Sequence, residues 1–427
     1  MNEHISRAIA ERIDDLVALT VDLIRFPTVN PPGEGYTPCT EYIANRLKKQ
    51  GFQTTLIRGE DTPGDNDRYP RTNVIARYEG RRPGPTVHFN SHIDVVEAGA
   101  GWTVDPFAGV VRDGKVYGRG ACDMKGGLAA SIIAAEAFIA VNPDFSGAIE
   151  ISGTVDEESG GFGGVAYLAQ KGFFSKPRVD HVIIPEPLNK DRICLGHRGV
   201  WWAEIETKGS IAHGSMPFLG DSAIRHMGAV LHAFEEELFP ALDAKQTRMP
   251  VVPEGARRST LNLNSVHGGQ TEDYFPGLPS PNVPDSCRLV IDRRFLIEED
   301  ISEVRNEVVR ILERLKRERP KFDYAIRDLM EVLPLMTESD APVPTAIARG
   351  IREVFGKEPE YVISPGTYDQ KHISRIGHLH DCVAYGPGIL DLAHRPDEWV
   401  GIDDMVESAK VMAIGLDVLL KGAAKAA

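Results

Sequence analysis

The stretch from Val87 to Met124 constrains this chain more than any other segment. It begins inside an apolar run, Thr86–Phe89, that predicts a buried strand. His92 and Asp94 follow two residues apart, so their side chains share one side of an extended segment. The chain then returns to Asp123, which precedes a glycine-rich turn and an alanine-rich helix. An imidazole and two carboxylates at the end of a strand form part of a site for a divalent metal ion.

Strand and helix patterns alternate on both sides of this stretch. Strands are predicted at residues 53–57, 73–78, 147–154 and 181–184, and helices at residues 39–50, 128–141 and 163–172. Strands that alternate with helices predict an α/β architecture with a mainly parallel central sheet.

The pattern changes near Gly199. From there the order strand, helix, strand, strand, helix, with a last strand near residues 322–329, predicts a smaller α+β domain of ferredoxin-like type. We therefore predict a catalytic domain in two parts, residues 1–198 and 331–427, interrupted by an inserted domain at residues 199–330. A length of 427 residues is consistent with two domains.

Composition excludes several classes of function. The net charge is −14 and no Lys/Arg-rich block is present, which argues against nucleic acid or an anionic membrane as a partner. The five cysteines are scattered without a CxxC pair, so we expect neither a disulfide framework nor a thiolate zinc site. Acidic residues near the N-terminus do not fit a signal peptide, and no run approaches the ~18 apolar residues of a membrane span. We expect a cytoplasmic protein.

Three adjacent carboxylates, Asp156, Glu157 and Glu158, follow the strand at residues 147–154 and precede a glycine-rich turn. They repel one another unless a cation compensates them. Ligand sites of α/β sheets also lie at the carboxyl ends of strands. Taken alone, the tripeptide is better explained as a solvated acidic turn, because runs of charge are usually solvated.

Two further residues bring the number of possible ligands to five. Glu186 lies between two prolines after a short apolar strand, and His394 lies in a loop. Either one alone could be structural. Together with His92, Asp123 and Glu158 they match the number of side chains that two metal ions with one bridging carboxylate require. Zn²⁺, Mn²⁺ and Co²⁺ accept such nitrogen and oxygen ligands, and Glu157, beside Glu158, is placed to transfer a proton.

Six motifs along the chain resemble the M20 family of metallopeptidases and deacylases, in the order of that family. They are S-H-x-D (Ser91–Asp94), G-R-G-x-x-D-M-K-G-G (Gly118–Gly127), D-E-E-x-G (Asp156–Gly160), P-E-P (Pro185–Pro187), A-H-G-S (Ala212–Ser215) and L-A-H-R-P-D-E (Leu392–Glu398). The resemblance covers nearly the whole chain. It implies a hydrolase with two divalent metal ions per subunit, which would be Zn, Mn or Co.

The resemblance also implies a role for each site residue. Asp123 would bridge the two ions, His92 and Glu186 would complete one site, and Glu158 and His394 would complete the other. Glu157 would be the general base and then the acid. Asp94 would hydrogen-bond to His92 and orient it.

The inserted domain would be a lid that forms a homodimer, and its His213 would reach the reacting oxyanion in the site of a partner subunit. Substrate contacts are implied for Arg198, Asn264, Arg294, Gly366, Thr367 and Tyr368. The alternative for Arg294 is an ordinary charge at a strand edge.

We therefore expect a hydrolase of a small molecule, one that breaks a non-peptide C–N bond. The leading hypothesis is N-deacylation of a carboxylate-bearing N-acyl amino acid of the acetylornithine or succinyl-diaminopimelate type, by metal-activated water. The alternative is a hydrolytic deaminase of an amino-aromatic or heterocyclic carboxylate, motivated by Tyr368 and Trp201. A non-catalytic metal-binding homologue is a third hypothesis, and the complete set of ligands speaks against it.

Overall fold

A computed structural model describes residues 2–251, 253–269 and 281–421, and the chain divides into two compact units. The larger unit comprises Met1–Gly196, Thr337–Val362 and Tyr368–Ala427. The smaller unit comprises His197–Met336 and Ile363–Thr367.

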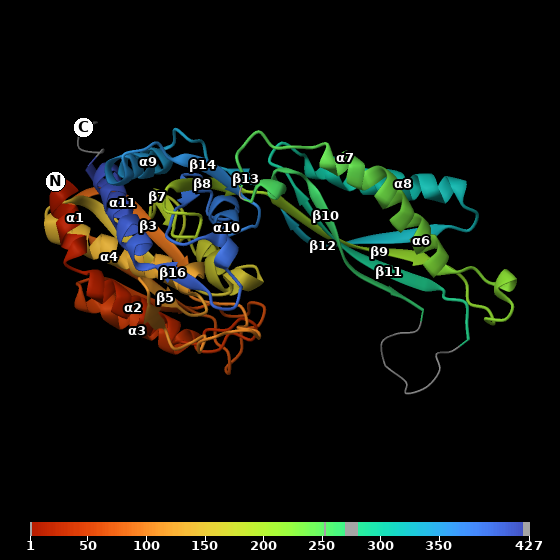
Figure 1. Cartoon of the computed structure of the whole chain (residues 1–427), viewed down its shortest axis with the longest axis horizontal. Helices are drawn as coiled ribbons and strands as arrows, with labels where there is room; N and C mark the ends of the chain where they lie inside the picture. The colour runs from red at the N-terminus through yellow and green to blue at the C-terminus, as the bar shows by residue number, and fades with distance from the viewer. Residues whose placement is uncertain (1, 252, 270–280, 422–427) are drawn as a thin grey trace. The chain divides into compact units, whose positions relative to one another are not determined.

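The larger unit is an α/β structure (Figure 1). Its helices are α1 (Asn2–Ala10), α2 (Ile13–Ile24), α3 (Tyr36–Lys49), α4 (Gly126–Val141), α5 (Tyr167–Gln170), α9 (Pro342–Phe355), α10 (Gln370–Arg375) and α11 (Ile402–Lys421). Its strands are β1 (Gln53–Arg58), β2 (Thr72–Glu79), β3 (Arg82–His92), β4 (Val110–Arg112), β5 (Lys115–Tyr117), β6 (Ser146–Thr154), β7 (His181–Ile184), β8 (Arg192–His197), β14 (Glu360–Ser364), β15 (Cys382–Ala384) and β16 (Trp399–Gly401).

The central sheet has the strand order β1-β2-β6-β3-β7-β15-β8. Strands β6, β3, β7 and β15 are parallel, whereas β1–β2, β2–β6 and β15–β8 are antiparallel pairs. The predicted α/β architecture is confirmed, but the sheet is mixed rather than mainly parallel. Residues 59–71, which connect β1 to β2, form a loop without a helix. Parallel neighbours need a crossover connection, usually a helix, so β2 pairs antiparallel with β1.

Helices α4 and α11 pack against the central strands β3 and β6. The segment Ala121–Val141, which contains α4, is long and apolar enough by composition to cross a membrane, with a mean hydropathy of 1.6. However, 83% of this window is buried inside the protein. Its one acidic residue after the first turn, Glu136, pairs with Arg46 of α3 at 2.9 Å. Ala121–Val141 therefore serves as a core helix of the larger unit.

The smaller unit consists of a four-stranded antiparallel sheet with helices packed against it. Its elements are β9 (Gly199–Lys208), α6 (Ala223–Ala233), α7 (Phe239–Asp243), β10 (Thr260–Gly268), β11 (Ser286–Phe295), α8 (Ile301–Glu318), β12 (Asp323–Val332) and β13 (Leu335–Met336). The sheet order β10-β11-β9-β12, with α6 and α8 as the two crossover helices, is the predicted ferredoxin-like arrangement. Alternate residues of β9, including Trp201 and Ile205, are buried in its core.

Candidate metal site

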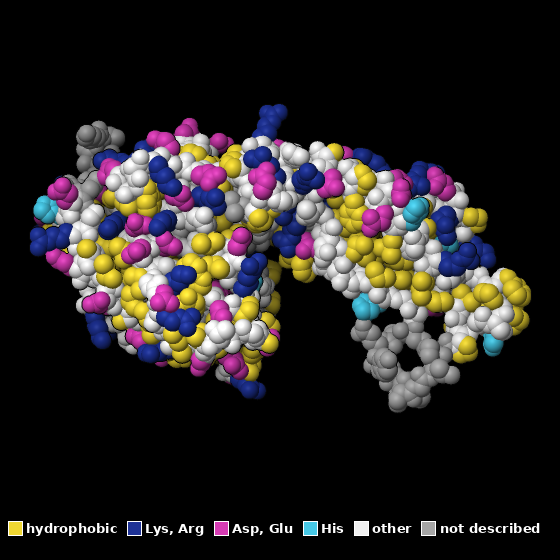
Figure 2. Space-filling model, in the orientation of Figure 1, with side chains coloured by type: hydrophobic (Ala, Val, Ile, Leu, Met, Phe, Trp, Pro, Cys, Tyr) yellow, Lys and Arg dark blue, Asp and Glu magenta, His cyan; other side chains and the backbone are white. Residues whose placement is uncertain are grey.

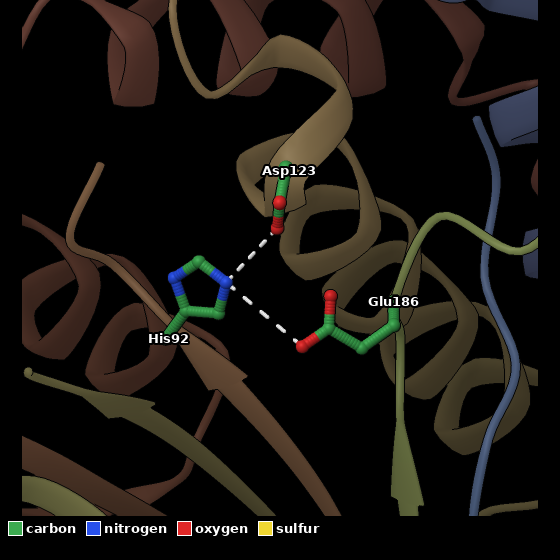
Figure 3. A group of neighbouring side chains, drawn as sticks. All are labelled: His92, Asp123 and Glu186. Atoms are coloured by element: carbon green, nitrogen blue, oxygen red, sulfur yellow. Dashed lines mark hydrogen bonds and ion pairs between the residues drawn. The ribbon is translucent and has the colours of Figure 1, made fainter. Parts of the chain in front are cut away.

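Three side chains converge at the carboxyl ends of β3 and β7 (Figure 3). Nε2 of His92 lies 3.1 Å from Oδ1 of Asp123 and 3.9 Å from Oε1 of Glu186. One ligand atom from each of the three lies within 4.8 Å of the others, a spacing that can hold a metal ion. His92 is the last residue of β3, and Glu186 comes two residues after β7.

A second group of three shares Asp123 with the first. Nε2 of His394 lies 3.1 Å from Oε1 of Glu158 and 3.5 Å from Oδ2 of Asp123. The two carboxylate oxygens of Asp123 therefore face different histidines, Oδ1 toward His92 and Oδ2 toward His394. This is the arrangement expected of a carboxylate that bridges two ions.

Glycine at position 127 permits the approach of the two segments that carry Asp123 and Glu186. A Cβ atom at this position would lie 2.0 Å from the carbonyl oxygen of Pro185. This distance is too short for any residue with a side chain. Gly127 belongs to the first turn of α4, immediately after the turn that holds Asp123. The glycine pair of the D-M-K-G-G motif therefore allows the start of α4 to contact the loop of Glu186 directly.

The electrostatics of the site favour cations. Burial, together with the charge of Asp123, raises the pKa of Glu186 well above its usual range and that of Glu158 to about 7. Hydrogen bonds with Asp123 and Glu158 raise the pKa of His394 to about 10. Carboxylates this close together and this deeply buried require a compensating positive charge. The nitrogen and oxygen donors fit Zn²⁺, Mn²⁺ or Co²⁺ and include no thiolate.

Asp94 contacts His92 through its main-chain carbonyl oxygen, whereas a hydrogen bond to the carboxylate would be another common way to orient a ligand histidine. Nδ1 of His92 lies 2.9 Å from the main-chain carbonyl oxygen of Asp94, but 3.6 Å from its carboxylate. The carboxylate instead accepts hydrogen bonds from the backbone N–H groups of Glu157 (3.2 Å) and Glu158 (3.1 Å), and from the Asn30 amide (3.0 Å). The carbonyl directs Nε2 of His92 toward the ligand group, and the carboxylate fixes the main chain of the acidic turn.

The acidic turn itself is not solvated. Asp156 is 2% exposed and accepts hydrogen bonds from Arg71 and Tyr36, both at 3.1 Å. Glu157 accepts a hydrogen bond from Nζ of the buried Lys371 at 3.1 Å. The three carboxylates therefore have separate surroundings: Asp156 pairs within the core, Glu157 faces a lysine, and Glu158 faces His394.

A buried ion pair outside the ligand set connects the two halves of the site. Nη1 of Arg119 lies 2.5 Å from Oε2 of Glu398, and both side chains are fully buried. Oε1 of Glu398 accepts the backbone N–H of Asp123 at 3.1 Å, while Arg119 also donates to the carbonyl of His394 at 3.2 Å. The pairing of β5 with β16 brings these distant segments together.

We expect Arg119→Met to destabilise the larger unit by about 3–5 kcal/mol, because it leaves Glu398 buried without its charge partner. Loss of the Arg119 guanidinium also releases the carbonyl of His394, so the affinity for metal should fall. Thermal unfolding and metal titration of the variant measure both effects, with Arg112→Met, an exposed arginine in β4, as the control. Unchanged stability and affinity would show that the pair does not support the site.

The substrate residues implied by the family lie mainly in the smaller unit. His213 and Asn264 are exposed, the first on a loop and the second on β10. Gly366 and Thr367 are partly exposed. Arg294 is already engaged, because its guanidinium donates to both carboxylate oxygens of Asp292, at 2.7 and 3.0 Å.

Two of the residues implied to contact substrate, Arg198 and Tyr368, are buried in the structure. Arg198 is 6% exposed and donates to the carbonyls of Ala256, Arg258 and Pro365, so it ties together loops of the smaller unit. Tyr368 is 4% exposed, and its hydroxyl donates to Gln370 at 2.6 Å. These positions speak against direct substrate contact by either side chain.

Sequence reasoning missed three supporting residues: Arg119, Glu398 and Lys371. Arg119 and Glu398 stand inside the motifs that carry the resemblance, but nothing in their spacing shows that they pair. Lys371 belongs to none of these motifs, and only the fold places it against Glu157.

Comparisons with known proteins find relatives over more than nine-tenths of the chain. The model of peptidase family M20/M25/M40 matches residues 88–416. The succinyl-diaminopimelate desuccinylase of Methylobacillus flagellatus is 30% identical over 412 residues, which cover 94% of this chain and 98% of that protein.

Solved structures share the fold. A dipeptidase from Saccharomyces cerevisiae has a TM-score of 0.74 at 18% identity and covers 99% of this chain and 99% of its own. A dinuclear metal-binding M20 peptidase from Bacillus subtilis has a TM-score of 0.67 at 16% identity, with 96% and 99% covered. At these identities the likeness establishes the fold alone.

Proposed function

Because the chain belongs to peptidase family M20/M25/M40, a family of metal-dependent hydrolases, we propose that it removes the acyl group from a small N-acyl amino acid. The proposed substrate bears a carboxylate, as N-succinyl and N-acetyl amino acids do. The desuccinylase relatives, 29–30% identical over more than nine-tenths of the chain, support this choice.

One arrangement supports the proposal. Two groups of possible ligands share Asp123, and Glu157, a carboxylate that belongs to neither group, is the neighbour of the possible ligand Glu158. His92 and Glu186 would hold one divalent ion, and Glu158 and His394 the other. A structural zinc site would instead be closed and rich in cysteine, so the ligand set favours catalysis. It also speaks against a non-catalytic homologue.

Two bound divalent ions would polarise the acyl carbonyl and lower the pKa of a water molecule. Proton transfer and stabilisation of the developing charge would then be performed by residues of the protein. Glu157 accepts the proton of the attacking water and returns it to the departing nitrogen. His213 of a partner subunit stabilises the negative charge that develops on the carbonyl oxygen.

The deaminase alternative is motivated by two aromatic residues, Tyr368 and Trp201, but both of their side chains are buried. Trp201 is 1% exposed within the core of the smaller unit, where its ring N–H donates to Asp328 at 2.7 Å. Tyr368 is buried as well. Neither ring is available to a flat substrate, so we retain deacylation as the proposed reaction.

A substrate screen with controlled metal content tests the proposal. We expect the purified protein to release succinate or acetate from N-acyl amino acids, to lose this activity on chelation, and to regain it with Zn²⁺, Mn²⁺ or Co²⁺. The metal that restores the highest rate identifies the working ion. Full activity after chelation, or ammonia release from amino-aromatics without any deacylation, would contradict the proposal.

We also propose that the enzyme is a cytoplasmic homodimer assembled through the smaller unit. Apolar side chains gather on one face of this unit (Figure 2). Among the described residues of this unit, the exposed large apolar side chains are those of Ile211, Met216, Phe218, Leu219, Ile224, Val266 and Leu329. Ile224 on α6 lies beside the end of the edge strand β10, where Val266 also lies. A helix and an edge strand that are both apolar favour pairing with a second copy.

The proposed location in the cytoplasm is supported by the five cysteines, which are buried thiols. A reducing compartment keeps cysteines in this form.

Charges placed on the apolar face of the smaller unit should dissociate the dimer. We expect sedimentation to give the parent chain a mass of twice 46.9 kDa, and to give the Ile224→Glu, Val266→Glu double variant the mass of one chain. Turnover should fall with the dimer, because His213 would no longer reach a second site. Val111→Glu, at an exposed apolar position in the larger unit, is the control. A parent chain that sediments as a monomer at full activity would exclude this role of His213.

A further inference from the structure

The two central strands of the larger unit carry a row of polar side chains on one face. In the parallel pairing of β3 with β6, His88 lies opposite Glu150, Asn90 opposite Ser152, and His92 opposite Thr154. All six side chains are 0–1% exposed. We call these six residues the polar ladder. It runs along the sheet toward the carboxyl end of β3, where His92 joins the metal site.

Hydrogen bonds connect the ladder to the start of α10. Nε2 of His88 lies 2.8 Å from the hydroxyl of Ser152, and that hydroxyl donates to Oδ1 of Asn90 at 2.7 Å. Nδ2 of Asn90 then donates to Oδ2 of Asp369 at 2.9 Å. Asp369 is 2% exposed and comes directly before α10.

The direction of these bonds is determined by proton counting. An ionised Asp369 only accepts, so the amide of Asn90 must face it with its NH₂ group. Oδ1 of Asn90 then accepts the single proton of the Ser152 hydroxyl, which in turn accepts from Nε2–H of His88. With Asp369 ionised, His88, Ser152 and Asn90 therefore have one orientation each, and the row of bonds is ordered from His88 to Asp369.

The far end of the ladder is anchored at the surface. Oε1 of Glu150 lies 2.9 Å from Arg77 and 2.7 Å from Arg178, and Oε2 of Glu150 lies 3.1 Å from Nδ1 of His88. The two arginine side chains are 25% and 36% exposed, whereas Glu150 is fully buried. The ladder therefore begins at a rigid, doubly paired carboxylate.

The near end reaches the proposed general base. Lys371, two residues after Asp369, is 4% exposed, and its ammonium donates to Oε1 of Glu157 at 3.1 Å. The carbonyl oxygen of Asp369 accepts the backbone N–H of His372 at 3.0 Å, so Asp369 begins the turn of α10 that carries Lys371. Lys371 therefore connects a turn that the ladder fixes with the carboxylate proposed to transfer the proton.

Stability alone does not explain the ladder. The opposite face of the same strands is apolar, with Val87, Phe89, Ile149 and Ile151 all fully buried. Buried polar networks are generally no more stabilising than apolar side chains of similar volume, but they do impose a unique geometry.

We propose that the polar ladder positions Lys371 through Asp369, and that Lys371 in turn positions the Glu157 carboxylate for proton transfer. This inference rests on the proposed function. Asp369, Asn90 and Ser152 are then positioning residues for the reaction, although Ser152 touches neither Glu157 nor any possible metal ligand.

A double-mutant cycle in the full-length, metal-loaded enzyme tests the proposal. We expect Lys371→Met to lower kcat about 100-fold with little change in KM, and Lys371→Arg to recover part of the loss. Ser152→Ala should lower kcat about three- to tenfold in the parent enzyme, but should have no further effect in Lys371→Met. Equal effects of Ser152→Ala in both backgrounds, or an unchanged kcat in Lys371→Met, would overturn it.

Ser91→Ala is the matched control, because Ser91 is a fully buried serine of β3 whose hydroxyl forms no hydrogen bond with the part of the chain that the structure describes. It should leave kcat unchanged, and a loss as large as that of Ser152→Ala would contradict the ladder. Crystal structures provide a readout apart from activity: the Glu157 carboxylate should be displaced in Lys371→Met and unmoved in Ser91→Ala. If the parent enzyme releases no acyl group from any substrate, the proposed function fails. These structures would still decide whether Lys371 positions Glu157.

Discussion

Glu157→Gln is expected to lower kcat about 10³-fold while the enzyme keeps its metal ions. Glutamine preserves the size of the side chain but cannot accept and return a proton, and a positioned general base contributes 10²–10⁴-fold to a rate. Glu157 lies outside both groups of possible ligands, and its backbone N–H donates to Asp94, a contact that the substitution leaves intact. Steady-state kinetics and elemental analysis of one preparation measure the two effects together.

The decisive comparison is between turnover and metal content. Glu60→Gln, in an exposed loop, controls for the handling of a glutamine variant. Should Glu157→Gln retain parental turnover, another group must transfer the proton. Should it lose metal as well as turnover, Glu157 would be a ligand rather than a base.

Asp123→Ala is expected to remove both metal ions and all measurable turnover. Asp123 is the one side chain common to the two groups of ligands, with one oxygen toward each histidine. Its loss leaves each group with only two protein ligands. Elemental analysis after dialysis should find about two ions per chain in the parent and none in the variant.

His394→Ala distinguishes a shared site from two independent ones. This variant should lose the ion held with Glu158 and keep the ion held by His92, Asp123 and Glu186. Asp391→Asn, an exposed residue of the same loop, is the control. If Asp123→Ala lost only one ion, the two groups would not share a bridging carboxylate.

The possible ligands could be predicted from the sequence because each stands at a place that the fold makes predictable. His92 and Glu186 follow buried strands of a parallel sheet, and such strands direct their carboxyl ends to the same edge. The structure brings the five side chains into two groups that share Asp123 and that could each hold a metal ion. The ferredoxin-like order of the smaller unit was predictable for a similar reason, since its strands alternate regularly.

The supporting contacts could not be predicted, because they depend on register and burial rather than on local pattern. Arg119 and Glu398 meet only through the pairing of β5 with β16. Tyr368 is buried, and its hydroxyl donates to Gln370, which in turn donates to main-chain carbonyls on β8 and β15. A residue type that could bind a substrate could equally pack, and local sequence does not separate the two.

The order of the ligands along the chain has a consequence for biosynthesis. By the time the ribosome has added Glu186, the polypeptide already contains every member of the group formed with His92 and Asp123. The other group lacks His394 until the polypeptide reaches residue 394, more than 200 residues later. A translation product that stops before this point would therefore contain one complete group of possible ligands and only two members of the other.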